Sequence, residues 1–220
     1  MDKSFVWSYS FLSTYARCAR QGQARYITKE MPYVETPEMA RGNAVHSAFE
    51  VAIEKEEKMS GALAEYERYA APVIAAKKSG ANVVPELKLG VTHDWKPTGF
   101  FDSNVWGRGK LDAPIIHGST AFLIDWKTGN TWEDPTELNV QAVLLHALRP
   151  ELTSIKGCYV WLKAGMYGTT YDLLAEVERT KDWIEGTMDK LGKGLFYATP
   201  NKLCGWCDLM SCAHNKKGKK

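Results

Sequence analysis

The sequence predicts an α/β fold, in which a small β-sheet is combined with helices that precede, interrupt and follow it. Two observations lead to this class. Segments with apolar residues at helical spacing alternate with short runs rich in Val, Ile and Phe, which Gly and Pro punctuate. The length of 220 residues, with 45% hydrophobic and 25% charged residues, suits one globular domain with a full hydrophobic core.

The N-terminal part of the chain is predicted to be helical. A short helix is expected around Ser8 to Ala19, and another from Ala62 to Lys78. Between them, the stretch from Pro37 to about Lys58 has proline near its start and apolar residues at helical spacing, namely Met39, Val45, Ala48, Phe49, Ala52 and Ile53.

From Val83 onward the pattern changes to strands. Three apolar runs, roughly 83–92, 103–116 and 120–127, are expected to form a three-strand meander. The remaining elements are expected as a helix, two strands and a helix, over 135–148, 155–162, 169–174 and 175–191. The predicted core order is therefore α, β, β, β, α, β.

Charge and targeting signals say little about function. A net charge of +2 does not identify a nucleic-acid binder, because such proteins carry a clustered basic face that a total cannot reveal. The one basic block is the tail at 216–220, to which no role is assigned. Because the chain has neither an apolar run of membrane-spanning length nor a signal-peptide pattern, we expect a cytoplasmic protein.

The most informative segment is Phe122-Leu123-Ile124-Asp125-Trp126-Lys127-Thr128-Gly129, an apolar strand whose end presents an acid and a lysine. Asp125 and Lys127 are two residues apart, so on a strand their side chains leave from the same face. A carboxylate can hold a hard divalent cation, and an ammonium can orient water or stabilise charge on a phosphate. Such pairs are also common on solvated strand ends, so the pair alone does not identify a site.

Three further polar residues lie at suggestive positions. Asp112 interrupts an apolar run and would lie beside Asp125 if the two strands form a hairpin; two such carboxylates repel unless a cation lies between them. His46 follows Gly42 by one helical turn, and Gln141 lies in the helix expected at 135–148. Taken singly, each is also compatible with a surface or packing role.

Together these residues resemble a known family. In order and approximate spacing, they match the motifs of the RecB-like branch of the PD-(D/E)XK nucleases, over about half the chain: Gly42-x-x-x-His46, Gly109-x-x-Asp112, Ile124-Asp125-Trp126-Lys127-Thr128-Gly129 and Gln141. The family often has a tyrosine four residues after the glutamine, whereas this chain has Leu145 followed by His146. The resemblance therefore does not extend to a DNA-contacting tyrosine on this helix.

The resemblance implies a restriction-endonuclease-like core and a role for each motif residue. Asp112, Asp125 and the carbonyl of Trp126 would bind Mg²⁺ or Mn²⁺, with His46 as an additional ligand suited to Mn²⁺. Lys127 would act on the attacking water. The catalytic set would be Asp112, Asp125, Lys127 and Gln141, and Glu86 would be a supporting acid near the site.

The cysteines extend the resemblance. In a reducing compartment, metal ligation or burial explains cysteines better than disulfides do. One cysteine before the core and a C-x-x-C-x₄-C set after it resemble the cluster-bearing subgroup, which includes AddB-type helicase-nucleases and CRISPR-adaptation nucleases. A [4Fe–4S] cluster is then implied, with Cys158 left as a core residue and four ligands, Cys18, Cys204, Cys207 and Cys212. A structural zinc ion is the rival interpretation.

The expected protein is thus a single nuclease domain over 1–220, with a core at about 37–175, a cluster-binding subdomain from 1–36 and 176–215, and a basic tail. Its expected activity is metal-dependent hydrolysis of DNA, as an exonuclease on single-stranded or end-bearing substrates. Recombination, repair or replication proteins are the expected partners, and the oligomeric state is left open. The alternative is a non-catalytic DNA-binding or adaptor module that keeps the fold and the cluster.

Overall fold

A computed structural model of the chain describes residues 5–217, so Lys219 and Lys220 of the basic tail lie outside the described residues. The chain forms two compact units. The central unit comprises Thr36–Thr180, and the terminal unit comprises Met1–Glu35 together with Lys181–Lys220. Among the described residues, no helix is long and apolar enough to cross a bilayer.

The central unit contains two β-sheets. The larger has the strand order β1-β5-β6-β7-β8, with β9 also paired to β7, and the smaller has the order β3-β2-β4. In the larger sheet β6 and β7 are parallel and the other pairs are antiparallel. The larger sheet consists of β1 (Asn82–Val83), β5 (Ala113–His117), β6 (Thr120–Lys127), β7 (Ser154–Trp161), β8 (Met166–Tyr167) and β9 (Tyr171–Asp172). The smaller consists of β2 (Leu87–Val91), β3 (Pro97–Thr98) and β4 (Gly107–Leu111).

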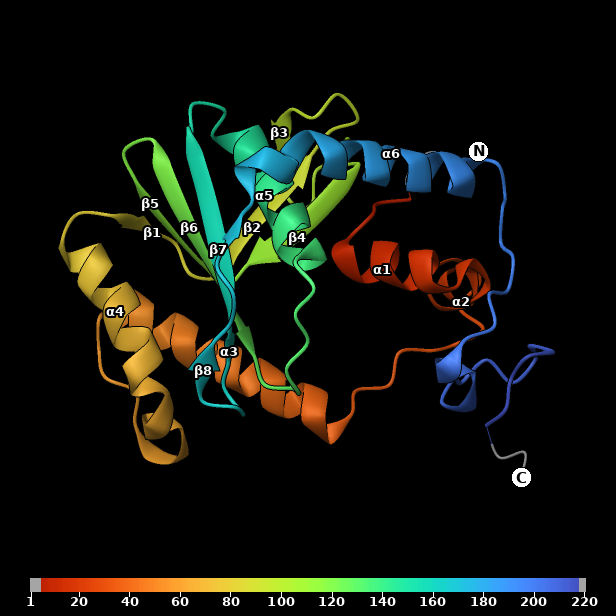
Figure 1. Cartoon of the computed structure of the whole chain (residues 1–220), viewed down its shortest axis with the longest axis horizontal. Helices are drawn as coiled ribbons and strands as arrows, with labels where there is room; N and C mark the ends of the chain where they lie inside the picture. The colour runs from red at the N-terminus through yellow and green to blue at the C-terminus, as the bar shows by residue number, and fades with distance from the viewer. Residues whose placement is uncertain (1–4, 218–220) are drawn as a thin grey trace. The chain divides into compact units, whose positions relative to one another are not determined.

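Two helices cover one face of the larger sheet (Figure 1). Helix α3 (Pro37–Lys55) begins after Thr36, whose side chain accepts a hydrogen bond from the Met39 N–H. A 3₁₀ segment, η2 (Gly61–Tyr66), then leads into α4 (Glu67–Lys78). The indole of Trp126 on β6 stacks on Phe49 of α3 with ring centroids 4.1 Å apart, so burial of this aromatic pair fixes α3 against the sheet.

Helix α5 (Thr136–Leu148) packs against both sheets. Along α5 nearly every residue from Leu138 to Leu145 is buried, including Gln141. A Cβ placed on Gly109 of β4 would lie 2.6 Å from Leu144 Cδ1, so only glycine allows this strand to approach the helix so closely. After η3 (Leu174–Glu176), α6 (Val177–Gly192) leads out of the central unit.

The three-strand meander does not form. The run at 83–92 divides into β1 and β2, and the run at 103–116 divides into β4 and β5; in each case the two halves belong to different sheets. Both breaks occur at buried acids: Glu86 has a left-handed backbone, with φ of 54°, and its N–H donates to the Asp112 carbonyl. The chain therefore changes sheets at the two residues whose side chains face the candidate site.

The terminal unit joins segments from both ends of the chain. It holds α1 (Tyr9–Arg17), α2 (Ala19–Gly22) and a π-helix, η1 (Gln23–Ile27), together with η4 (Lys202–Gly205). The backbone N–H of Arg20 donates to the carbonyl of Tyr197. A small buried cluster of Ala24, Met31 and Leu209 lies beside two cysteines, Cys207 and Cys212.

Candidate active site

The end of β6 presents an acid and a lysine toward α5. Asp125 is 2% exposed, and the Lys127 Nζ atom lies 2.6 Å from its Oδ2 atom. The Gln141 amide on α5 donates to Asp125 Oδ1 at 2.7 Å. Asp125 Oδ2 is buried and meets the Lys127 ammonium. Because a carboxylate oxygen has two lone pairs, this atom retains capacity for a further electrophilic partner.

Asp112 lies between β4 and β5, next to the Ala113–Ile124 pair of the β5–β6 ladder. Its Oδ2 atom accepts the Trp126 N–H at 2.9 Å, and its Oδ1 atom is 3.3 Å from His46 Nδ1. Burial, followed by the charge of Asp125, raises the pKa of Asp112 to about 6. The two carboxylates thus repel each other at low dielectric, which is the electrostatic condition that a cation relieves.

His46 extends from α3 into this group. Its Nδ1 atom is 3.2 Å from Glu86 Oε1, and its Nε2 atom is 3.0 Å from the Trp126 carbonyl oxygen. Burial lowers the pKa of His46, but hydrogen bonds with Asp112 and Glu86 and their charges outweigh it and raise the pKa to about 10. For Glu86 the effects have the opposite sign. Burial raises its pKa, but contacts with His46 and Lys110 outweigh burial and leave the pKa below its usual value.

His46, Glu86 and Asp112 are suited to hold a metal ion. One ligand atom from each lies within 4.8 Å of the others, and no other group of at least three His, Cys, Asp or Glu residues in the described part of the chain meets this criterion. Nitrogen and carboxylate oxygen are donors that Mn²⁺ accepts, and Mg²⁺ favours the carboxylates. The Trp126 carbonyl reaches the same imidazole, whereas the Asp125 oxygens meet Gln141 and Lys127.

Sequence reasoning missed Glu137. Its Oε2 atom lies 2.7 Å from Lys127 Nζ, so the ammonium bridges Glu137 and Asp125. Burial, then the charge of Asp125, raises the pKa of Glu137 to about 7. Burial lowers the pKa of Lys127, but the charges of the two acids outweigh it and raise the pKa above its usual value. The sequence spacing could have identified Glu137, because it precedes Gln141 by four residues and therefore lies on the same helix face.

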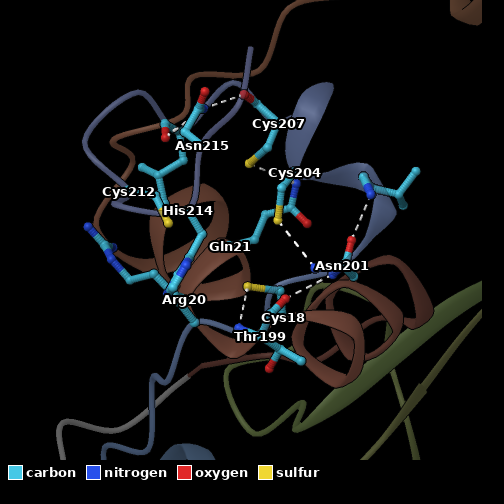
Figure 2. A pocket seen from close by; sticks show the side chains of 13 residues that line it. Cys18, Arg20, Gln21, Thr199, Asn201, Cys204, Cys207, Cys212, His214 and Asn215 are labelled. Carbon is cyan, nitrogen blue, oxygen red and sulfur yellow. Dashed lines mark hydrogen bonds between the residues drawn. The ribbon is translucent and has the colours of Figure 1, made fainter. Parts of the chain in front are cut away.

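Four cysteines line one pocket of the terminal unit, Cys18, Cys204, Cys207 and Cys212, and Figure 2 shows their side chains around it. Three N–H groups point at sulfur: Thr199 N donates to Cys18 at 3.5 Å, Asn201 N to Cys204 at 3.3 Å, and Gln21 Nε2 to Cys207 at 3.7 Å. Cys158 instead lies on β7 in the central unit, 3% exposed, and burial raises the pKa of its thiol to about 11.

A solved structure with a similar fold and a family model were found in comparisons with known proteins. The chain is similar to the crystal structure of SSO0001, with a TM-score of 0.53 and 15% sequence identity over 98% of this chain and 89% of that one. At this identity the likeness shows the fold alone. A search of curated proteins found no match. The family model of the PD-(D/E)XK nuclease superfamily matches residues 6–212, and the chain therefore belongs to that superfamily.

Proposed function

We propose that the chain is a metal-dependent DNA nuclease of the RecB-like branch, acting as an exonuclease on single-stranded or end-bearing DNA. The observation that carries the proposal is the convergence of two buried acids, Asp112 and Asp125, with Lys127 at one point of the fold. Membership of the superfamily supplies the reaction class, since its members are nucleases. A protein that only binds DNA gains nothing from two repelling carboxylates beside the phosphates.

His46, Asp112, Asp125 and the Trp126 carbonyl would hold Mg²⁺ or Mn²⁺, with Glu86 close enough to take part. The ion would supply Lewis-acid charge and a lowered pKa for water at the scissile phosphate. Glu86 enters this set because it shares the close group with His46 and Asp112. Ion binding would be pH-dependent, since the imidazole must lose its proton to become a ligand.

The remaining residues position groups and stabilise charge. Gln141 holds the Asp125 carboxylate through its Oδ1 atom, which fixes the acid's rotamer. Lys127, held between Asp125 and Glu137, would orient the water and stabilise negative charge that develops on the phosphate. The low exposure of Asp125 keeps this charge network at low effective dielectric, where it acts more strongly than in bulk water.

We further propose that Cys18, Cys204, Cys207 and Cys212 ligate a [4Fe–4S] cluster. Four thiols on one pocket match the soft ligands that iron–sulfur clusters take, and three N–H donors beside them would stabilise the thiolate charge. In a Cys₄ zinc site with Zn–S bonds of about 2.3 Å, sulfur atoms lie about 3.8 Å apart. The same four thiols would serve such a zinc ion, so iron, sulfide and zinc analysis of the purified protein distinguishes the two groups.

The nuclease is tested on 5′-labelled single-stranded DNA with Mg²⁺ or Mn²⁺, with and without EDTA. Wild-type protein should cleave in either metal and stop on chelation, and Asp125→Ala and Lys127→Ala should each lower the cleavage rate by about 10³-fold. Far-UV circular dichroism should be unchanged, which separates loss of chemistry from loss of fold. Cleavage at wild-type rates by either variant would remove that residue from the site, and a wild type that binds but never cuts would favour the adaptor alternative.

A further inference from the structure

We propose that the outer face of the small sheet is a track for single-stranded DNA that leads to the candidate active site. The track consists of Lys88 on β2, Arg108 on β4, and Phe100 and Phe101 in the segment between β3 and β4. This inference rests on the proposed nuclease function and names the surface that recognises the substrate. All of its residues belong to the central unit.

The strand register places the cationic residues on one face. Lys88 lies opposite Lys110, and Gly90 lies opposite Arg108, so the three long cations share a face of the β2–β4 ladder. The other face carries Leu89, Gly109 and Leu111 and packs on α5, as the 2.6 Å approach of a Gly109 Cβ to Leu144 indicates. The cationic face is therefore directed away from the helix.

The charges on this face are balanced only in part within the described residues. Two lysines directly opposite each other on a ladder repel, which destabilises the pair. The Lys110 ammonium contacts Glu86, but Lys88 is exposed and has no ion-pair partner within the described residues. A DNA backbone laid over the ladder would supply the missing negative charge, and the counterions it releases would add to affinity.

An aromatic platform continues the cationic face. The Arg108 guanidinium lies 4.9 Å from the Phe100 ring centroid and 5.6 Å from that of Phe101, and its Nη1 atom donates to the Phe100 carbonyl at 3.2 Å. Phe101 is nonetheless 77% exposed. A phenylalanine held at the surface by a cation offers a π-face on which an unpaired base can stack.

The track ends at the acids. Along β4, Arg108 is followed by Lys110, whose ammonium contacts Glu86. Asp112 is the first residue after the end of this strand. Four residues of antiparallel strand span about 14 Å, which is longer than one nucleotide step. A substrate that occupies the active site must therefore extend beyond the two nucleotides that flank the scissile phosphate to reach Phe101. The bases must also be unpaired to stack, so the occupant is a single strand rather than a duplex.

The test measures binding and cleavage separately. Anisotropy of fluorescein-labelled 15-mer oligo(dT) in EDTA reports binding without turnover. Phe101→Ala and Arg108→Ala should each raise Kd by about 5- to 50-fold, as expected for loss of one stacking or cation contact. Lys88→Ala should reduce the slope of log Kd against log salt by about 0.7, the value for one phosphate contact on a single strand. Lys78→Ala, which removes an exposed lysine of α4, is the matched control and should bind as wild type does.

Cleavage assays separate this inference from the proposed function. Phe101→Ala should raise KM for the 15-mer while leaving kcat/KM for a dinucleotide at the wild-type value, because the dinucleotide does not reach the platform. If wild-type protein cleaves DNA but the three track variants bind the 15-mer with wild-type Kd and salt slope, the track is wrong. If wild-type protein cleaves nothing, the nuclease proposal fails while the binding series still decides the track. Equal competition by blunt duplex would overturn the preference for a single strand.

Discussion

The two units of the molecule organise their polar groups in different ways. In the central unit the acids are buried and each meets a specific partner: Asp125 meets Gln141 and Lys127, and Asp112 meets His46 and the Trp126 N–H. In the terminal unit the cysteines are half-buried and are met mainly by N–H donors, beside a small apolar cluster. The central site is thus held in place by specific polar partners, whereas the cysteine pocket lies beside a buried apolar cluster of only three residues.

This difference predicts whether a substitution in each unit reduces activity or stability. A site whose charges are fixed by burial should lose chemistry, rather than structure, when one charged group is removed. A pocket with a small core should depend on whatever its thiols bind, because ligand binding then contributes directly to folding. The predictions below test the two halves of this contrast.

The largest expected effect is on the terminal unit. Cys18→Ala should abolish most of the broad visible absorbance of anaerobically purified protein and lower Tm by about 5 °C or more, because the cluster would join segments separated by most of the chain. Iron and sulfide should be near-equal in the wild type. Absorbance, metal analysis and thermal melts measure these effects.

Cys158→Ala is the matched control for Cys18→Ala. It removes a buried thiol from β7, so it should leave the colour intact while slightly lowering stability through loss of packing. A colourless Cys158 variant beside a brown Cys18 variant would show that the fourth ligand had been misassigned. Stoichiometric zinc in colourless wild-type protein would replace the cluster by a zinc site.

A smaller effect is expected from Glu137, whose half-buried carboxyl has a pKa raised from 4.5 to about 7. Because the folded state binds this proton more tightly than the unfolded chain does, the contribution to stability is full below about pH 4.5 and is lost as pH rises through 7. The free energy of unfolding without divalent metal should fall by on the order of 2 kcal/mol across this window. Glu137→Gln should flatten the fall.

Urea denaturation at several pH values between 4.5 and 7.5 measures this effect. Glu65→Gln is a suitable control, since it changes an exposed glutamate of η2. A Glu137 variant whose stability falls with pH as steeply as that of the wild type would show that another group, such as Asp112, controls the titration.

The sequence was sufficient to predict that Asp112, Asp125 and Lys127 lie close together. The two-residue period of a strand places Asp125 and Lys127 on one face, and in the structure their side chains are in contact. The hairpin needed to bring Asp112 near them exists as β5–β6. These relations are local or span one turn, so short-range periodicity was enough to predict them.

Other relations depend on the fold and were not predictable from periodicity. The breaks at Glu86 and Asp112 lie within runs that read as continuous strands, because the residues around them remain apolar. Tertiary structure divides each run, because its two halves pair with different sheets. At one of the two breaks, Glu86 adopts a positive φ. The close grouping of Glu86 with His46 therefore required the three-dimensional structure.

The smallest expected effect concerns His46, the ligand that distinguishes two metals. Imidazole nitrogen is a softer donor than carboxylate oxygen, so its loss should weaken Mn²⁺ binding more than Mg²⁺ binding. His46→Ala should therefore raise the Mn²⁺ concentration for half-maximal cleavage by about tenfold and the Mg²⁺ value by much less. His117→Ala, at an exposed position on β5, is the matched control. If both metals gave the same activation curves for variant and wild type, His46 would be a packing residue that holds Asp112 and Glu86 in place, and the acids alone would bind the ion.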